Sequence, residues 1–166
     1  MQFTSQNEGF SGAPALPWLL LEPQRAFCEM LSLVPALPML AGAPRGDGHP
    51  VVVLPGFMAD DGSTIALREF LVRIGYDVHG WGFGRNLGPR DQLSERLEAR
   101  ISELHRRSGR RVSLIGWSLG GVYAREIAKW IPDPIRSVVT LGSPFGDISR
   151  GTNVTRMLDW LRPNAP

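Results

Sequence analysis

Between residues 50 and 141 the sequence alternates short runs of β-branched residues with longer stretches whose apolar residues recur at helical spacing. The short runs predict strands at about 50–54, 76–79, 111–115 and 135–141, and the longer stretches predict helices at about 64–74, 92–107 and 122–131. Strands separated by helices pair in parallel through right-handed crossovers, with helices on both faces of the sheet. The predicted fold class is therefore α/β, with a predominantly parallel sheet flanked by helices.

The length and composition of the chain predict one main hydrophobic core. Of the 166 residues, 43% are apolar and 20% are charged, as in an ordinary globular domain. We predict that residues 1–48 form an N-terminal arm and short apolar helices packed on the core. Residues 49–166 then form the α/β core itself, with a further short helix at about 155–161.

Composition argues against several classes of function. The net charge is only +2 and the arginine clusters lack interleaved aromatic residues, which argues against nucleic-acid binding. Cys28 is the only cysteine and no zinc-ligand spacing occurs, so no metal site is expected. The glycines of GWGFGRNLG at 80–88 lack the spacing of a dinucleotide fingerprint, so no cofactor is expected. No apolar run reaches the roughly 18 residues of a membrane span, and no signal peptide is evident, which predicts a cytoplasmic protein without a transmembrane segment.

The segment GWSLGG at 116–121 joins a predicted strand to a predicted helix. Gly-x-Ser-x-Gly in this setting is the pattern of a nucleophile elbow, a tight turn that lifts a serine hydroxyl clear of the sheet. Gly116 and Gly120 remove side chains that would collide with the neighbouring strand and helix, and the helix points its positive end at the serine. Ser118 is therefore the candidate nucleophile; the alternative is a glycine-rich connection without chemistry.

An acyl-transfer serine needs two backbone N–H donors aimed at the developing oxyanion. We expect one from Leu119, which directly follows Ser118. We expect the other from Phe57, in the loop that follows the first predicted strand, because Gly56 lets the backbone of this loop approach closely.

At these residues the sequence resembles the α/β-hydrolase superfamily, particularly its esterase- and lipase-like branches. LPGF at 54–57 is similar to the oxyanion loop, although many members have His-Gly where this chain has Pro55-Gly56. GWSLGG is similar to the nucleophile elbow, and VVTLGSPFG at 138–146 to the strand and loop after the elbow helix. The resemblance covers about residues 50–146 and implies an α/β-hydrolase-like three-layer sandwich. It also implies carboxylic-ester hydrolysis through an acyl-serine, with Ser118, Phe57 and Leu119 in the roles given above.

In this superfamily an acid and then a histidine follow the serine along the chain. Here all three histidines, His49, His79 and His105, precede Ser118. Asp147 is a possible acid, since it follows the fourth predicted strand at the correct edge of the sheet. We therefore expect the hydrolase fold to be truncated before its last strands, and the chain to be a fragment or a degenerate, weakly active homologue.

Apolar side chains near the predicted site suggest that it binds a small-molecule ester or acyl substrate. The candidates are Phe57, Met58, Trp81, Phe83, Trp117 and Phe145. Three functions remain open: a serine esterase or lipase-like hydrolase, an acyltransferase that uses the same acyl-serine, and a catalytically dead hydrolase-fold module that binds a ligand or partner. The acyl-chain length and the oligomeric state are also open.

Overall fold

The computed structural model describes residues 39–40, 42–90 and 92–143. The chain divides into two compact units, Met1–Ala43 and Pro44–Pro166, and the elements below all belong to the second. Phe145, Asp147 and the helix predicted at 155–161 lie outside the described residues, as does most of the predicted N-terminal part. No helix in the described ranges is long and apolar enough to cross a membrane.

Four parallel strands form one sheet within the described residues, in the order β2-β1-β3-β4. The strands are β1 (Pro50–Leu54), β2 (Asp77–Gly80), β3 (Val112–Trp117) and β4 (Ile135–Leu141). The predicted parallel sheet is confirmed, and the predicted bounds of the first and fourth strands match. β3 extends two residues further than predicted, because its pairing with β4 continues to Trp117 opposite Leu141.

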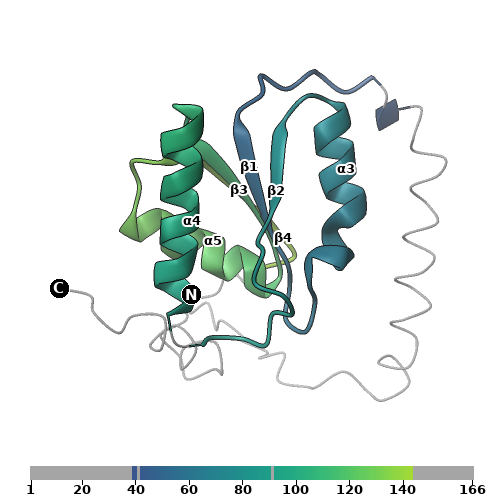
Figure 1. Cartoon of the computed structure of the whole chain (residues 1–166). Helices are drawn as coiled ribbons and strands as arrows, with labels where there is room; N and C mark the ends of the chain where they lie inside the picture. The colour runs from purple at the N-terminus through teal and green to yellow at the C-terminus, as the bar shows by residue number, and fades with distance from the viewer. Residues whose placement is uncertain (1–38, 41, 91, 144–166) are drawn as a thin grey trace, which may run out of the picture. The chain divides into compact units, whose positions relative to one another are not determined.

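Helices cover both faces of this sheet, giving three layers (Figure 1). A 3₁₀ turn, η1 (Asp61–Thr64), leads into α3 (Ile65–Arg73), which packs on one face. The other face carries α4 (Leu93–Ser108) and α5 (Leu119–Trp130). α5 begins three residues earlier than predicted, so it starts immediately after Ser118.

The alternation of side chains along β1 divides the core between the two faces. Val51 and Val53 pack with Leu71 of α3, whereas Val52 and Leu54 pack with α4 and α5. All five residues of β1 are buried, as expected of a central strand covered on both faces. The predicted apolar stripes of the helices also face the core: Leu67, Phe70, Leu71, Ile74, Leu93, Leu97, Ile101 and Leu104.

Local capping explains where several helices begin and end. The Asp60 side chain accepts a hydrogen bond from the Gly62 amide and caps η1. Gly109 ends α4 in the left-handed conformation that a C-terminal glycine favours. At the start of α4 the capping position is held by Gln92, with a φ of 62° and no hydrogen bond from its side chain to the helix.

We predict that Gly120→Ala strongly destabilises the fold. A Cβ at Gly120 would lie 2.2 Å from the carbonyl oxygen of Leu54 and 2.7 Å from that of Pro55, so α5 would have to move off β1. Overpacking against rigid backbone of this kind is expected to lower the free energy of unfolding by about 2–3 kcal/mol, measured by urea denaturation.

Gly56→Ala is the matched control, because a Cβ at Gly56 would meet nothing closer than 3.4 Å. Its expected cost is below about 1 kcal/mol. Equal losses in the two variants would contradict the tight contact between α5 and β1.

Candidate active site

The candidate site lies at the edge where the parallel strands end. β1 ends at Leu54, β3 at Trp117 and β4 at Leu141, and these strands are neighbours in the sheet. Their following loops therefore meet at one edge, the position at which open α/β sheets bind ligands. The loops carry Gly56, Ser118 and Ser143 respectively.

Ser118 forms a strained bend between β3 and α5. Its φ of 50° and ψ of −116° are rarely adopted by a residue with a side chain, and such a conformation costs about 1–3 kcal/mol. Hydrogen bonds hold it on both sides. The Ser118 amide donates to the carbonyl of Leu141 at 2.8 Å, while the Ser118 carbonyl accepts from Ser143 Oγ at 2.8 Å and from the Gly121 amide at 3.0 Å.

Glycines are required on both sides of this bend. A Cβ at Gly116 would lie 2.3 Å from the carbonyl oxygen of Gly120, and one at Gly121 would lie 1.9 Å from Ser143 Oγ. Real Cβ atoms do not approach other atoms so closely. The turn therefore needs the spacing Gly116, Gly120 and Gly121 around Ser118, as the sequence predicted.

The loop after β1 passes directly beside Ser118. A Cβ at Gly56 would lie 3.4 Å from Ser118 Cβ and 3.4 Å from the carbonyl oxygen of Trp117. Ser118 itself is half-buried, and within the described residues its hydroxyl has no hydrogen-bond partner. Among the described residues, the hydroxyl therefore takes no part in holding the fold together.

Several backbone amides near Ser118 have no acceptor in the described part of the chain: those of Gly56 and Phe57 in the loop after β1, and those of Leu119 and Gly120 at the start of α5. The first turn of any helix leaves its amides unpaired, so the Leu119 amide follows from its place at the start of α5. The Phe57 amide is more informative, because the next two amides in the same loop are bonded. Met58 N–H donates to the carbonyl of Asn86 at 2.7 Å, and Ala59 N–H donates to that of Gly56 at 3.2 Å.

The predicted substrate contacts fall into different environments. Phe57, Met58 and Trp117 are 60%, 53% and 48% exposed, so they offer apolar surface at this edge. Trp81, by contrast, is fully buried in the core, and its indole N–H donates to the carbonyl of Gly84 at 2.7 Å. Phe83 packs edge-on against Trp81 and is only partly exposed. Trp81 is therefore a core residue, and it has no surface to offer a substrate.

His79 and His105 do not reach Ser118. In the sheet, His79 lies level with Val52, and Val52 lies level with Leu114. Leu114 precedes Ser118 by four residues, so the rise along the strand separates His79 from Ser118 by about 13 Å. Its Nε2 lies 3.1 Å from a carboxylate oxygen of Asp77, without hydrogen-bond geometry. His105 lies near the end of α4, where its Nδ1 contacts the carbonyl of Arg110 at 2.9 Å.

His49 belongs to a hydrogen-bonded array at the opposite edge of the sheet. Its Nε2 lies 2.7 Å from Ser113 Oγ and its Nδ1 lies 2.5 Å from Asp47 Oδ1, the connectivity of a Ser-His-Asp triad. Ser113 is buried and precedes Ser118 by five residues of β3, which is about 16 Å of strand. The array therefore fastens the residues before β1 to the beginning of β3, and it cannot serve Ser118.

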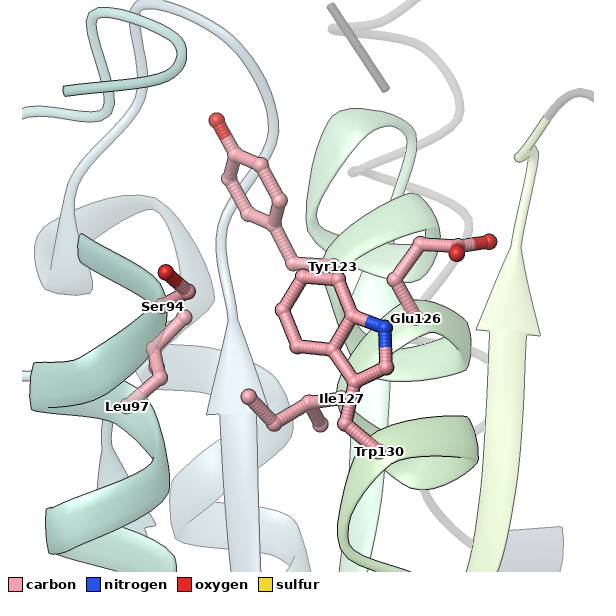
Figure 2. A pocket seen from close by; sticks show the side chains of 6 residues that line it. All are labelled: Ser94, Leu97, Tyr123, Glu126, Ile127 and Trp130. Carbon is pink, nitrogen blue, oxygen red and sulfur yellow. The ribbon is translucent and has the colours of Figure 1, made fainter. Parts of the chain in front are cut away.

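A shallow hollow lies between α4 and α5 (Figure 2). It is lined by Ser94, Leu97, Tyr123, Glu126, Ile127 and Trp130. None of the predicted site residues lines it. Among the described residues no cluster of three or more histidine, cysteine or acidic side chains is placed to hold a metal ion.

No protein-family model and no curated protein matches this sequence. Solved structures of similar fold include a lipase of Bacillus licheniformis in its mature form, with a TM-score of 0.50 and 21% identity, matched over 62% of this chain and 44% of that one. A monoacylglycerol lipase of Paleococcus ferrophilus gives a TM-score of 0.52 and 22% identity, over 72% and 49% of the two chains. The chain has the α/β-hydrolase fold, and its match spans just under half the length of these two proteins.

We predict that Asp47 contributes to stability in a pH-dependent way. Hydrogen bonds from His49 and Arg136 hold the pKa of the Asp47 carboxyl well below its ordinary value of 3.8. A lowered folded-state pKa stabilises the fold fully above the unfolded-state pKa, and this contribution is lost as the pH falls through the folded-state pKa. Wild type should therefore exceed Asp47→Asn in free energy of unfolding at about pH 7, and the difference should narrow as the pH falls from about 4 to about 2. A gap that stays constant in urea denaturation over this range would show that the ionised carboxylate is not responsible.

Proposed function

We propose that the chain is the nucleophile-bearing part of a serine hydrolase that acts on carboxylic esters through an acyl-serine intermediate. The conformation of Ser118 carries this proposal, because a strained backbone persists only where surrounding contacts enforce it, and such strain gathers at functional sites. The unpaired amides of Phe57 and Leu119 beside it support the same chemistry.

The proposed reaction has two stages. Ser118 Oγ attacks the ester carbonyl carbon, and the carbonyl oxygen becomes an oxyanion that accepts hydrogen bonds from the Phe57 and Leu119 amides. The alcohol leaves with the proton that a base took from Ser118, and water then attacks the acyl-serine and releases the acid. None of the three histidines of this sequence, His49, His79 and His105, reaches Ser118, so none of them is this base. Asp147 stays the candidate acid.

An apolar acyl or alkyl group is the proposed substrate feature. The exposed side chains of Phe57, Met58 and Trp117 supply apolar surface at the edge that carries Ser118. Two solved structures of the same fold are a lipase and a monoacylglycerol lipase, which supports an ester substrate. Since no histidine follows Ser118 in the sequence, we expect this chain alone to hydrolyse esters slowly.

The proposal predicts covalent labelling at one residue. The 166-residue chain incubated with a fluorophosphonate should form a phosphonyl adduct on Ser118, located by peptide mass spectrometry. The adduct should form slowly, because no histidine of this sequence is placed to take the proton from Ser118. Ser118→Ala should abolish both the adduct and any hydrolysis of p-nitrophenyl esters.

Ser113→Ala is the matched control, since Ser113 lies on β3, the strand that leads to Ser118, and has a histidine partner. Its labelling at Ser118 should be unchanged. An adduct on Ser113 would contradict the proposal, and the absence of any adduct in wild type would favour a hydrolase-fold module that only binds. Transfer of the acyl group to an added alcohol in preference to water would instead identify an acyltransferase.

A further inference from the structure

Asn86 is a fully buried polar residue in the connection between β2 and α4. A primary amide removed from water without partners destabilises a fold, so buried amides are normally hydrogen-bonded. Asn86 is bonded through both its side chain and its backbone, and its partners come from three parts of the chain.

Three of these hydrogen bonds reach the loop that carries Phe57. Asn86 Nδ2 donates to the carbonyl of Pro55 at 2.9 Å, and Asn86 N–H donates to the carbonyl of Ala59 at 2.7 Å. The Asn86 carbonyl in turn accepts from Met58 N–H at 2.7 Å. Asn86 thus holds the chain on both sides of Phe57, while the Phe57 amide itself has no acceptor among the described residues.

The opposite side of the same amide group faces α5. Asn86 Oδ1 accepts from the Gly88 amide at 3.2 Å and lies 3.5 Å from the hydroxyl of Tyr123. Tyr123 is buried on α5, the helix that starts immediately after Ser118. Burial raises the pKa of Tyr123, so its hydroxyl stays a neutral donor. One side chain therefore spans the loop after β1 and the helix behind the candidate nucleophile.

We propose that Asn86 is a positioning residue, which fixes the Phe57 amide relative to Ser118 so that it can donate to the oxyanion. This inference rests on the proposed function. Oxyanion donors act only at hydrogen-bond distance, and a misplacement of about 1 Å can lower a rate about 100-fold. Asn86 acts through the backbone of residues 55–59 and does not touch the substrate.

The test compares Asn86→Ala and Asn86→Asp with wild type in the full chain. Alanine removes the donor to Pro55, and aspartate places an acceptor against that carbonyl while keeping the shape of asparagine. We expect both variants to lower the maximal rate of Ser118 phosphonylation by a fluorophosphonate at least about tenfold, with little change in the reagent concentration for half-maximal rate.

Ile101→Ala controls for a general loss of stability. Ile101 lies on α4 and is fully buried in the core. Among the described residues, it forms no hydrogen bond with residues 55–59. At a temperature where all variants are folded, Ile101→Ala should be phosphonylated at the wild-type rate. Equal rates for Asn86→Ala and wild type, or equal losses in Asn86→Ala and Ile101→Ala, would overturn the proposal.

Hydrogen exchange separates this inference from the proposed function. The Met58 amide donates to the Asn86 carbonyl, and loosening of the loop should speed its exchange at least about tenfold in Asn86→Ala, beyond the change in Ile101→Ala. If wild type is not phosphonylated but Met58 exchange responds, the hydrolase proposal fails and Asn86 only fastens the loop. If Met58 exchange does not respond, Asn86 does not position the loop.

Discussion

The contact between α5 and the end of β1 determines the rest of this structure. Gly120 lies so close to the carbonyl of Leu54 that no side chain fits between them. Because α5 lies this close to β1, the chain turns from β3 into α5 within one residue. Ser118 forms that turn, with a positive φ of 50°. The strain at Ser118 is therefore set by backbone packing, and the hydrogen bonds to Leu141 and from Ser143 hold it in place.

The two edges of the sheet show that residue type alone does not define a hydrolase site. At one edge, Ser113, His49 and Asp47 have the hydrogen-bond order of a triad, but the serine is buried and the array holds strands together. At the other edge, Ser118 has no histidine beside it, yet it lies on a strained bend near amides that have no acceptor in the part of the chain that the structure describes. The proposed chemistry follows from this second arrangement, because acyl transfer needs an accessible hydroxyl facing oriented donors.

Local patterns predicted the sheet, the helices and the bend. Strand and helix periodicity, and the glycine spacing around Ser118, depend only on residues close together in sequence. The roles of Asn86, Trp81 and His49 depend on contacts between residues far apart in sequence, such as His49 with Ser113, and no local pattern encodes them. Trp81 was expected to contact the substrate because it is aromatic and near the predicted site, but its side chain is fully buried in the core.

The central claim is that Ser118 presents its hydroxyl to a point faced by the amides of Phe57 and Leu119. A crystal structure of the chain after reaction with an alkyl phosphonate tests it most directly. We expect phosphorus bonded to Ser118 Oγ, with the phosphoryl oxygen about 2.7–3.1 Å from both amide nitrogens. An adduct on another residue, or a phosphoryl oxygen beyond hydrogen-bond distance of both amides, would contradict it.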